Sequence, residues 1–363
     1  MKVLHFYHPQ NELQSRYVSL LTESMCRNVE SVALTTLPEV KSALSQQHFD
    51  ILHIHGCWSV NYAKAAGKAQ RMGTRTIITP HGELEPWILR NRQWQEKMPK
   101  TLLYQRQTIQ EAYVVIAMGN MERESLQELK WNPRIETIRN AAITRSVTPD
   151  DMTRQLLKVY QKVMDSDVFH VMNDKTRHAL FLLLRAATCG NAKWQKEPVP
   201  ELSRDEWRQL CIYIRSEQLE AAFHRAVYVL GLRLPDIDVS QVEYYLPAGY
   251  RPLKTIAETI GNKFVSENKR LLATFKYLHR LHTAQQMGMS HLVELTREIR
   301  EHDIDEEQLE EILQEEKLLP FAQRLMGVLG NLDLLEEGMM PIEAIDDKQT
   351  LKMETNITNR LKI

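Results

Sequence analysis

The chain has 363 residues, which exceeds the usual size of a single hydrophobic core and predicts two or three domains. Its 43% hydrophobic and 26% charged residues are typical of a globular protein and exclude extensive disorder. The 46 basic residues nearly balance the 47 acidic ones, so no overall charge favours nucleic acid or an anionic membrane.

The cysteines and the apolar runs predict the cellular compartment of the protein. The four cysteines lie far apart and show neither a CxxC pair nor another metal-ligand spacing: Cys26, Cys57, Cys189 and Cys211. This spacing predicts reduced thiols and no metal site. No uninterrupted apolar run is long enough to span a bilayer, and the first residues turn polar too soon for a secretory signal. We therefore expect a cytoplasmic protein.

The first part of the chain alternates strands with helices. Six short apolar runs predict strands at 3–6, 32–34, 49–55, 76–79, 113–117 and 134–138. Amphipathic stretches predict helices at 12–25, 37–44, 62–72 and 121–129. Such an alternation predicts an α/β Rossmann-like domain, in which helices cover a parallel sheet. We assign it to residues 1–148.

The second part of the chain shows helical periodicity throughout. Apolar residues recur three and four positions apart from Met152 to Leu332, and prolines mark the breaks between the stripes. We therefore predict an all-helical domain over residues 149–363. Charge divides in the same way: residues 1–150 carry 18 basic and 14 acidic residues, net +4, and the remainder carries 28 and 33, net −5. A weak helix-turn-helix pattern near 256–271 lies in this acidic part, so we expect no nucleic-acid partner.

Two clusters of polar and aromatic residues follow the third and fourth predicted strands. The first is the segment 53–59, His-Ile-His-Gly-Cys-Trp-Ser, and the second is the segment 79–87, Thr-Pro-His-Gly-Glu-Leu-Glu-Pro-Trp. Ligands of open parallel sheets bind beyond the carboxyl ends of the strands, where both clusters lie.

Each residue type in the two clusters suits a sugar or a phosphate. Gly56 and Gly82 allow close approach of the backbone, and His55 and His81 can exchange protons near neutral pH. Trp58 and Trp87 offer apolar faces to a pyranose ring. The alternative is that the histidines are ordinary strand residues and that the tryptophans pack helices on the sheet.

A basic stretch follows the second cluster. It contains Arg90, Arg92, Lys97, Lys100 and Arg106, interleaved with Trp87 and Trp94. Such a stretch could bind a phosphorylated acceptor or a lipid diphosphate headgroup. The alternative is an ordinary solvated face of a surface helix.

Together these segments resemble the amino-terminal domain of retaining GT-B glycosyltransferases of the family-four type. The resemblance rests on both clusters and on segments 103–106, 112–124 and 135–140, in matching order, and covers about residues 1–145. It implies a domain that shapes the acceptor side of an interdomain cleft, with His81 near the transferred sugar. It also implies a nucleotide-sugar donor as substrate, with no metal and no cofactor.

The chain also departs from that family. The stretch 7–13 after the first strand has no glycine, so the usual phosphate-binding loop lacks its key residues. The end of the domain reads Asn140-Ala141-Ala142 in place of Asn-Gly. The second Rossmann-like domain, which would hold the donor, is not recognisable in residues 149–363.

These observations lead to one assignment of function and leave two alternatives open. The resemblance assigns His81 as the catalytic residue. It also assigns a substrate-binding set: His55, Gly56, Trp58, Gly82, Glu83, Trp87, Arg90 and Arg92. The expected partners are a sugar or glycan acceptor, a protein that completes the donor side, and the inner face of a membrane as a peripheral contact. The expected context is polysaccharide biosynthesis. A non-catalytic glycan-binding or scaffold relative and an enzyme of another class remain open.

Overall fold

The computed structural model describes residues 1–25, 29–85, 94–190, 197–261 and 266–363 and contains two compact units. The first unit comprises residues 1–166, with 243–248 and Ile363 packed on it, and the second comprises residues 167–242 and 249–362. The sequence places the boundary at 148. In the structure the next helix, α8 (Pro149–Met164), buries Met152, Leu156 and Tyr160 among residues of the first unit, so that unit continues past 148.

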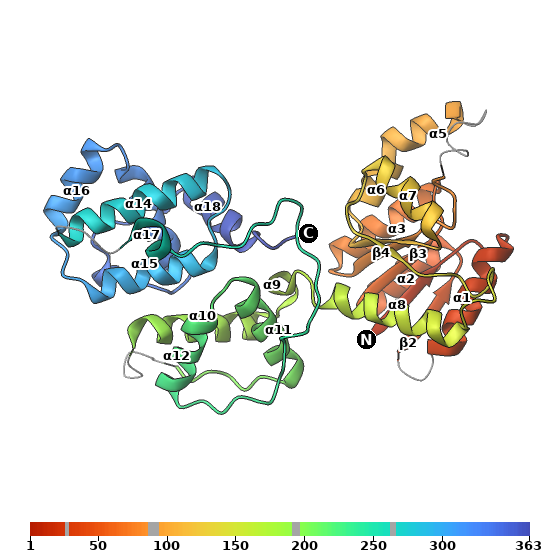
Figure 1. Cartoon of the computed structure of the whole chain (residues 1–363), viewed down its shortest axis with the longest axis horizontal. Helices are drawn as coiled ribbons and strands as arrows, with labels where there is room; N and C mark the ends of the chain where they lie inside the picture. The colour runs from red at the N-terminus through yellow and green to blue at the C-terminus, as the bar shows by residue number, and fades with distance from the viewer. Residues whose placement is uncertain (26–28, 86–93, 191–196, 262–265) are drawn as a thin grey trace. The chain divides into compact units, whose positions relative to one another are not determined.

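The first unit is built on one parallel sheet. Its six strands are β1 (Lys2–Phe6), β2 (Glu30–Leu34), β3 (Ile51–His55), β4 (Arg75–Thr79), β5 (Val114–Ala117) and β6 (Ile135–Thr137). They pair in the order β2-β1-β3-β4-β5-β6, and every pair is parallel. All six predicted strands are confirmed, and so is the Rossmann-like class (Figure 1).

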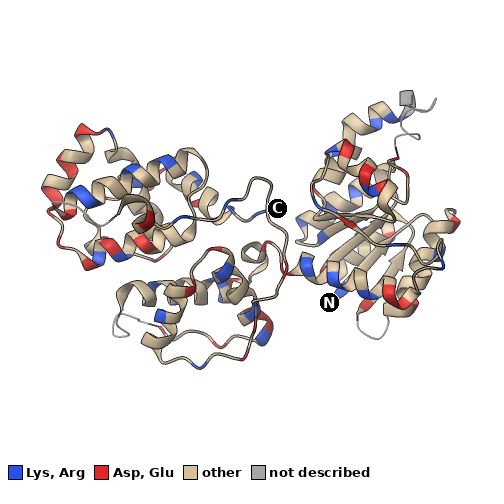
Figure 2. Cartoon of the chain, viewed as in Figure 1, with Lys and Arg blue, Asp and Glu red and all other residues tan. Residues whose placement is uncertain are grey.

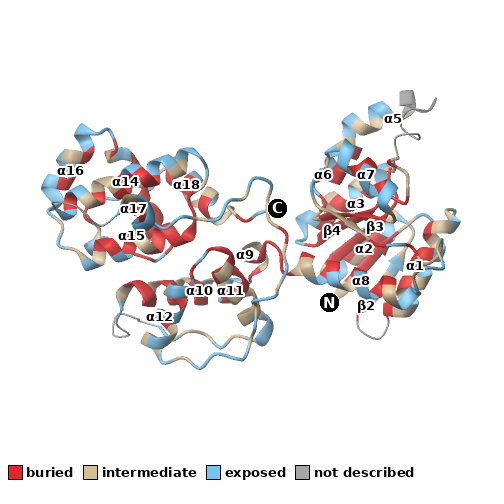
Figure 3. Ribbon diagram, viewed as in Figure 1, coloured by how far each residue is buried: buried red, intermediate tan, exposed pale blue. Residues whose placement is uncertain are grey.

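Helices cover both faces of this sheet. One face packs against α1 (Glu12–Met25) and α8, where Val3, Ile51 and Ile77 lie in the core. The other face packs against α2 (Leu37–Gln46), α3 (Val60–Arg71), α6 (Arg106–Gln110) and α7 (Asn120–Leu129). The central strands β3 and β4 are buried along their whole length, as Figure 3 shows. This explains their nearly continuous apolar sequences.

In the described part of the second unit the regular secondary structure is helical, which confirms the predicted helical region. Its helices are α9 (Val168–Val171), α10 (Asp174–Cys189), α11 (Arg204–Ser216), α12 (Glu220–Leu230), α13 (Ile256–Ile260), α14 (Glu267–Thr283), α15 (Met289–Glu301), α16 (Glu306–Glu315), α17 (Leu319–Asn331), η3 (Glu337–Met339) and α18 (Lys348–Thr358).

Local sequence signals set the ends of these helices. Ser203 and Thr255 form capping boxes with the glutamates three residues later, and Gly190 and Gly231 end α10 and α12 in left-handed conformations. Helix α16 is rich in acidic residues, whose positions are red along its ribbon in Figure 2.

Candidate functional site

An open pocket of about 710 Å³ lies beyond the carboxyl ends of β1 and β3. Its lining combines the loop after β1 and the start of α1 with residues that follow β3 and β4: His8, Gln10, Asn11, Glu12, Leu13, Gln14, Cys57, Tyr62 and Glu83. The strand order reverses between β1 and β3, because β2 lies beside β1 while the chain then continues from β3 toward β6. The pocket is therefore at the topological switch point, where open parallel sheets bind ligands.

Gln14 forms the buried floor that joins two walls of the pocket. Its side chain is 1% exposed. Its Oε1 accepts from the backbone N–H of His8 at 3.2 Å, and its Nε2 donates to Glu83 Oε1 at 3.1 Å. The loop after β1 is thus fixed to the loop after β4 through one side chain.

Gly56 allows Gln14 to take this position. Its φ is +109°, a conformation that L side chains rarely adopt, and a Cβ added there would lie 2.6 Å from Gln14 Nε2. The sequence predicts that Gly56 lets the backbone approach a ligand. In the structure its described close neighbours are the side chains of Gln14 and Tyr62, which both line the pocket, so Gly56 shapes the pocket floor.

Glu83 brings an ionisable group into the pocket. Its Oε2 accepts from the backbone N–H of Cys57 at 2.5 Å. Burial raises the pKa of Glu83 to about 7, and the Cys57 hydrogen bond and the nearby Lys97 ammonium oppose that rise. Because this pKa lies at neutral pH, the Glu83 carboxyl can either accept from or donate to a ligand hydroxyl there.

The two loops that follow β3 and β4 are held in strained conformations. Trp58 has φ 63° and His81 has φ 56°, both in the left-handed region that bulky residues rarely occupy. The Trp58 backbone N–H donates to Gln105 Oε1 at 2.6 Å, and its indole N–H donates to the Glu83 carbonyl at 2.8 Å. The indole bond holds the loop after β3 against the loop after β4, and the backbone bond ties it to the segment 101–105.

Glu122 of α7 holds the loop after β4 from the other side. Its two carboxylate oxygens accept from the backbone N–H groups of Gly82 and Met118, each at 2.7 Å. Burial raises the pKa of Glu122, while these two bonds act to lower it. The sequence did not single out Glu122, because nothing in a helical stretch shows which distant backbone its side chain reaches.

We expect Glu122→Gln to lower the free energy of unfolding by about 2 kcal/mol, because one of two buried N–H groups would then face an amide donor. Urea unfolding followed by circular dichroism measures the change. Glu124→Gln is the matched control: Glu124 is exposed on the same helix, and its replacement should change stability by less than about 0.5 kcal/mol. Equal effects of the two substitutions would contradict the role assigned to Glu122.

Four histidines form a buried network next to the pocket. His5 of β1 and His53 of β3 are register partners, and His53 and His55 lie on the same face of β3. His5 Nδ1 lies 3.0 Å from His55 Nε2, and His55 Nδ1 lies 3.3 Å from His81 Nε2. His53 bonds Tyr160 Oη at 2.7 Å and Thr79 Oγ1 at 2.8 Å. The three strand histidines are fully buried, and His81 is 8% exposed.

Burial keeps these imidazoles neutral. Desolvation lowers the pKa of His5 to about 4 and that of His81 to about 3. Desolvation, reinforced by the neighbouring histidines, lowers the pKa values of His53 and His55 well below the usual value. At neutral pH the network is therefore a set of uncharged donors and acceptors.

The same histidines are the one group in the described ranges whose geometry suits a metal. Single ligand nitrogens of His5, His53 and His55 all lie within 4.8 Å of one another. Their hydrogen bonds occupy every nitrogen of the three rings except His5 Nε2, which has no partner among the described residues. A metal would have to displace several of these bonds, so the arrangement favours a hydrogen-bonded network.

The structure brings some of the predicted site residues together and separates others. Glu83 lines the pocket, whereas His55 lies in the core beneath it. His81 is nearly buried, and its Nδ1 lies 3.1 Å from Met118 Sδ. Trp58 is half-buried, with the Lys97 ammonium 5.3 Å from its ring centroid. Trp87, Arg90 and Arg92 lie outside the described residues, so their assigned roles stay predictions, as does the role of His81.

The sequence missed the polar residues that the loop after β1 and the start of α1 bring to the pocket. Gln10, Asn11, Glu12 and Gln14 line it in the place where the family usually has a glycine-rich loop. The position of this stretch in the sequence could have indicated its role, because it directly follows the first strand of a parallel sheet.

One part of the chain is similar to a known protein family. Residues 12–145 match the model of Glycosyltransferase Family 4. The first unit is glycosyltransferase-like. The match confirms the resemblance to the amino-terminal domain of GT-B glycosyltransferases and does not extend to the donor-binding domain of that fold. No curated protein and no solved structure was found to match the chain.

Proposed function

We propose that this chain acts in glycosyl transfer by binding a sugar or glycan acceptor in the pocket of its family 4 domain. The observation that carries the proposal is the position of that pocket, at the switch point of a sheet whose sequence matches a glycosyltransferase family. In this proposal polysaccharide biosynthesis in the cytoplasm is the biological setting, and His81 assists at the transferred sugar.

The chemistry of the lining supports an uncharged polyhydroxylated ligand. Gln10, Asn11 and Gln14 are amides, and Glu12 and Glu83 are carboxyls. These groups pair with the alternating donors and acceptors of neighbouring sugar hydroxyls. No Lys or Arg appears among the described residues that line this pocket. A phosphate would meet two carboxyls and no cation there, so a neutral sugar fits better than an anionic one.

The donor side of the reaction needs a second surface. The described part of the second unit contains helices and no strand, so a parallel sheet of the donor-binding kind is not found there. We therefore propose that a partner chain, or the helical unit itself, holds the nucleotide sugar. The same observation favours a second candidate, in which the chain is a non-catalytic subunit that presents a glycan to a true transferase.

An exposed apolar strip on the family 4 domain supports peripheral contact with a membrane. Leu102 and Leu103 in η1 (Thr101–Gln105) are 75% and 76% exposed, and Met98 in α5 (Trp94–Lys100) is also exposed, as Figure 3 shows for these elements. Basic residues accompany the strip at Lys97, Lys100 and Arg106. An apolar surface with flanking cations is typical of interfacial helices. None of the described helices is long and apolar enough to cross a bilayer.

Saturation-transfer NMR with glucose, galactose and N-acetylglucosamine tests the acceptor proposal. We expect transfer to at least one of these sugars and at least a fivefold weaker signal in Glu83→Gln, because one acceptor oxygen of the pocket is lost. Glu85→Gln is the control, since Glu85 is two residues away and does not line the pocket. Glucose 6-phosphate should give no stronger saturation-transfer signal than glucose.

Three outcomes would contradict parts of the proposal. If none of the three sugars shows transfer at millimolar concentration, the acceptor site is not in this pocket. If UDP-glucose, GDP-mannose or ADP-glucose binds the purified chain and releases nucleotide, the chain carries its own donor site and the non-catalytic candidate is wrong. His81→Ala with unchanged activity in that assay would remove the catalytic role of His81.

A further inference from the structure

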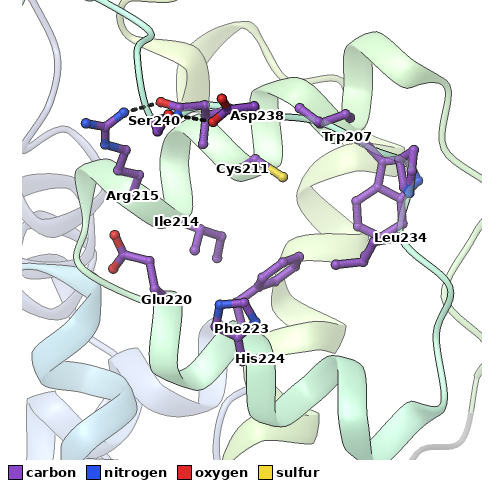
Figure 4. Close-up of a pocket in the computed structure, with 13 residues that line it drawn as sticks. Trp207, Cys211, Ile214, Arg215, Glu220, Phe223, His224, Leu234, Asp238 and Ser240 are labelled. Carbon is purple, nitrogen blue, oxygen red and sulfur yellow. Dashed lines mark hydrogen bonds between the residues drawn. The ribbon is translucent and has the colours of Figure 1, made fainter.

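A second pocket lies entirely within the helical unit, remote in sequence from the family 4 match. It has a volume of about 460 Å³ and lies between α11, α12 and the segment 234–240 that follows α12. Figure 4 shows side chains from all three elements arranged around one open space. Ligand pockets of folded proteins have volumes of about 300–1,000 Å³, so this one is large enough for a small molecule.

The inner surface of the pocket is apolar. α11 contributes Trp207, Cys211 and Ile214 at the spacing of one helical face, and α12 contributes Phe223. The segment 234–240 adds Leu234, Pro235, Ile237 and Val239. Ile214 and Phe223 are 2% and 6% exposed, and the Cys211 sulfur points into the space in Figure 4. Two aromatic rings with aliphatic neighbours form a surface for a flat ring system.

Hydrogen bonds hold the segment 234–240, which forms the third wall of the pocket, in place. The Arg215 guanidinium donates to the carbonyl of Val239, and the Arg204 guanidinium donates to the carbonyl of Asp236. The Asp238 carboxylate accepts from the backbone N–H of Ser240 at 2.8 Å. The segment is therefore fixed to both ends of α11, although it has no regular secondary structure.

The polar groups at the rim favour a cation. Asp238 lies near Arg215, whose charge helps to lower the pKa of Asp238, after the larger effect of its hydrogen bonds with Ser240. Glu220 has no ion pair and no hydrogen bond with any described residue through its side chain. The rim thus holds two carboxylates, those of Glu220 and Asp238, with one guanidinium, that of Arg215, and the imidazole of His224.

We propose that this pocket binds a small ligand that carries an apolar ring system and a cationic amine, with the ring against Trp207 and Phe223 and the amine at Glu220. The proposal is independent of the sugar-binding function, since every lining residue belongs to the helical unit. It gives the helical unit a role as a ligand-binding module.

Three indole compounds of nearly equal size test the proposal. Tryptamine is a cation, tryptophol is neutral and indolepropionate is an anion, and isothermal titration calorimetry measures the binding of each to the full chain. We expect tryptamine to bind at least fivefold more tightly than tryptophol, and indolepropionate to bind least. Equal affinities, or no saturable binding of any of the three, would overturn the proposal.

Matched variants locate the binding. Glu220→Gln should abolish the advantage of tryptamine over tryptophol, whereas Glu306→Gln, in the equivalent first turn of α16, should not. Leu234→Arg should abolish binding of all three compounds, since Leu234 lies on the pocket wall. Tyr228→Arg is its control on α12, because Tyr228 is 87% exposed and does not line the pocket. Unchanged binding in Leu234→Arg would place the ligand elsewhere.

Cysteine alkylation gives a readout that does not depend on a variant. Cys211 lines the pocket, whereas Cys189 does not, and both are half-buried. Saturating tryptamine should slow the reaction of N-ethylmaleimide with Cys211 at least threefold and leave Cys189 unchanged, as measured by peptide mass spectrometry. Equal protection of both thiols, or of neither, would contradict occupancy of this pocket.

Discussion

Lowering the pH from 7.5 to 5 is expected to destabilise the first unit by several kcal/mol. The cause is the buried histidine network of β1, β3 and the loop after β4. In the folded chain His5 and His81 keep pKa values of about 4 and about 3, against 6.5 for a solvated histidine. At pH 5 the unfolded histidines are protonated and the folded ones are neutral.

The direction of the effect follows from proton binding. Below pH 6.5 the unfolded state binds more protons than the folded state, so stability falls as the pH falls. A histidine that stays neutral in the fold costs about 2 kcal/mol at pH 5, since each pH unit corresponds to about 1.4 kcal/mol. His53 and His55 shift in the same direction. Stability should be fully restored above pH 6.5.

Urea unfolding at pH 7.5, 6, 5.5 and 5, with hydrogen exchange of β1 and β3, measures this loss. His5→Gln should reduce the slope of stability against pH, because it removes one titrating ring and keeps a side chain that can bond His55. His48→Gln is the control, since His48 is exposed. A slope that is flat below pH 6.5, or equal in both variants, would contradict neutral burial of the network.

The fold of the first unit was predictable because its strands are short and strongly apolar. The runs that contain Ile51, Ile77 and Val115 are buried on both faces of the sheet, and burial of that kind leaves a continuous apolar signal. The helical spacing of apolar residues in the second part of the chain was equally clear in the sequence. Helix α8 was the exception, since its buried face resembles that of any amphipathic helix and does not show which unit it packs on.

The candidate site was predictable only in its location. The sequence placed polar clusters at the carboxyl ends of two neighbouring strands, and the pocket lies there. It did not reveal that His55 points into the core, because both faces of β3 are covered and alternation alone cannot distinguish a ligand-facing side chain from a buried one. It also missed Gln14 and Glu122, whose roles depend on backbone groups far away in the chain.

Gly56→Ala is expected to lower the free energy of unfolding by about 3 kcal/mol and to abolish sugar binding. The φ of +109° would strain an alanine, and its Cβ would lie 2.6 Å from Gln14 Nε2 and 3.2 Å from the Tyr62 ring. Gln14 would have to move, which would break its bonds to His8 and Glu83. The pocket would then lose its floor together with its link between two walls.

Gly67→Ala separates this effect from the general cost of replacing glycine. Gly67 lies inside α3, and nothing lies within 4 Å of a Cβ built there. Alanine favours helix over glycine, so this variant should gain about 0.5–1 kcal/mol. Urea unfolding measures the change in the free energy of unfolding of each variant, which should be a gain for Gly67→Ala and a loss for Gly56→Ala. Saturation-transfer NMR should show the sugar signal retained in Gly67→Ala and lost in Gly56→Ala. If Gly56→Ala instead kept both its stability and its sugar signal, that result would contradict the role assigned to Gln14 as the floor of the site.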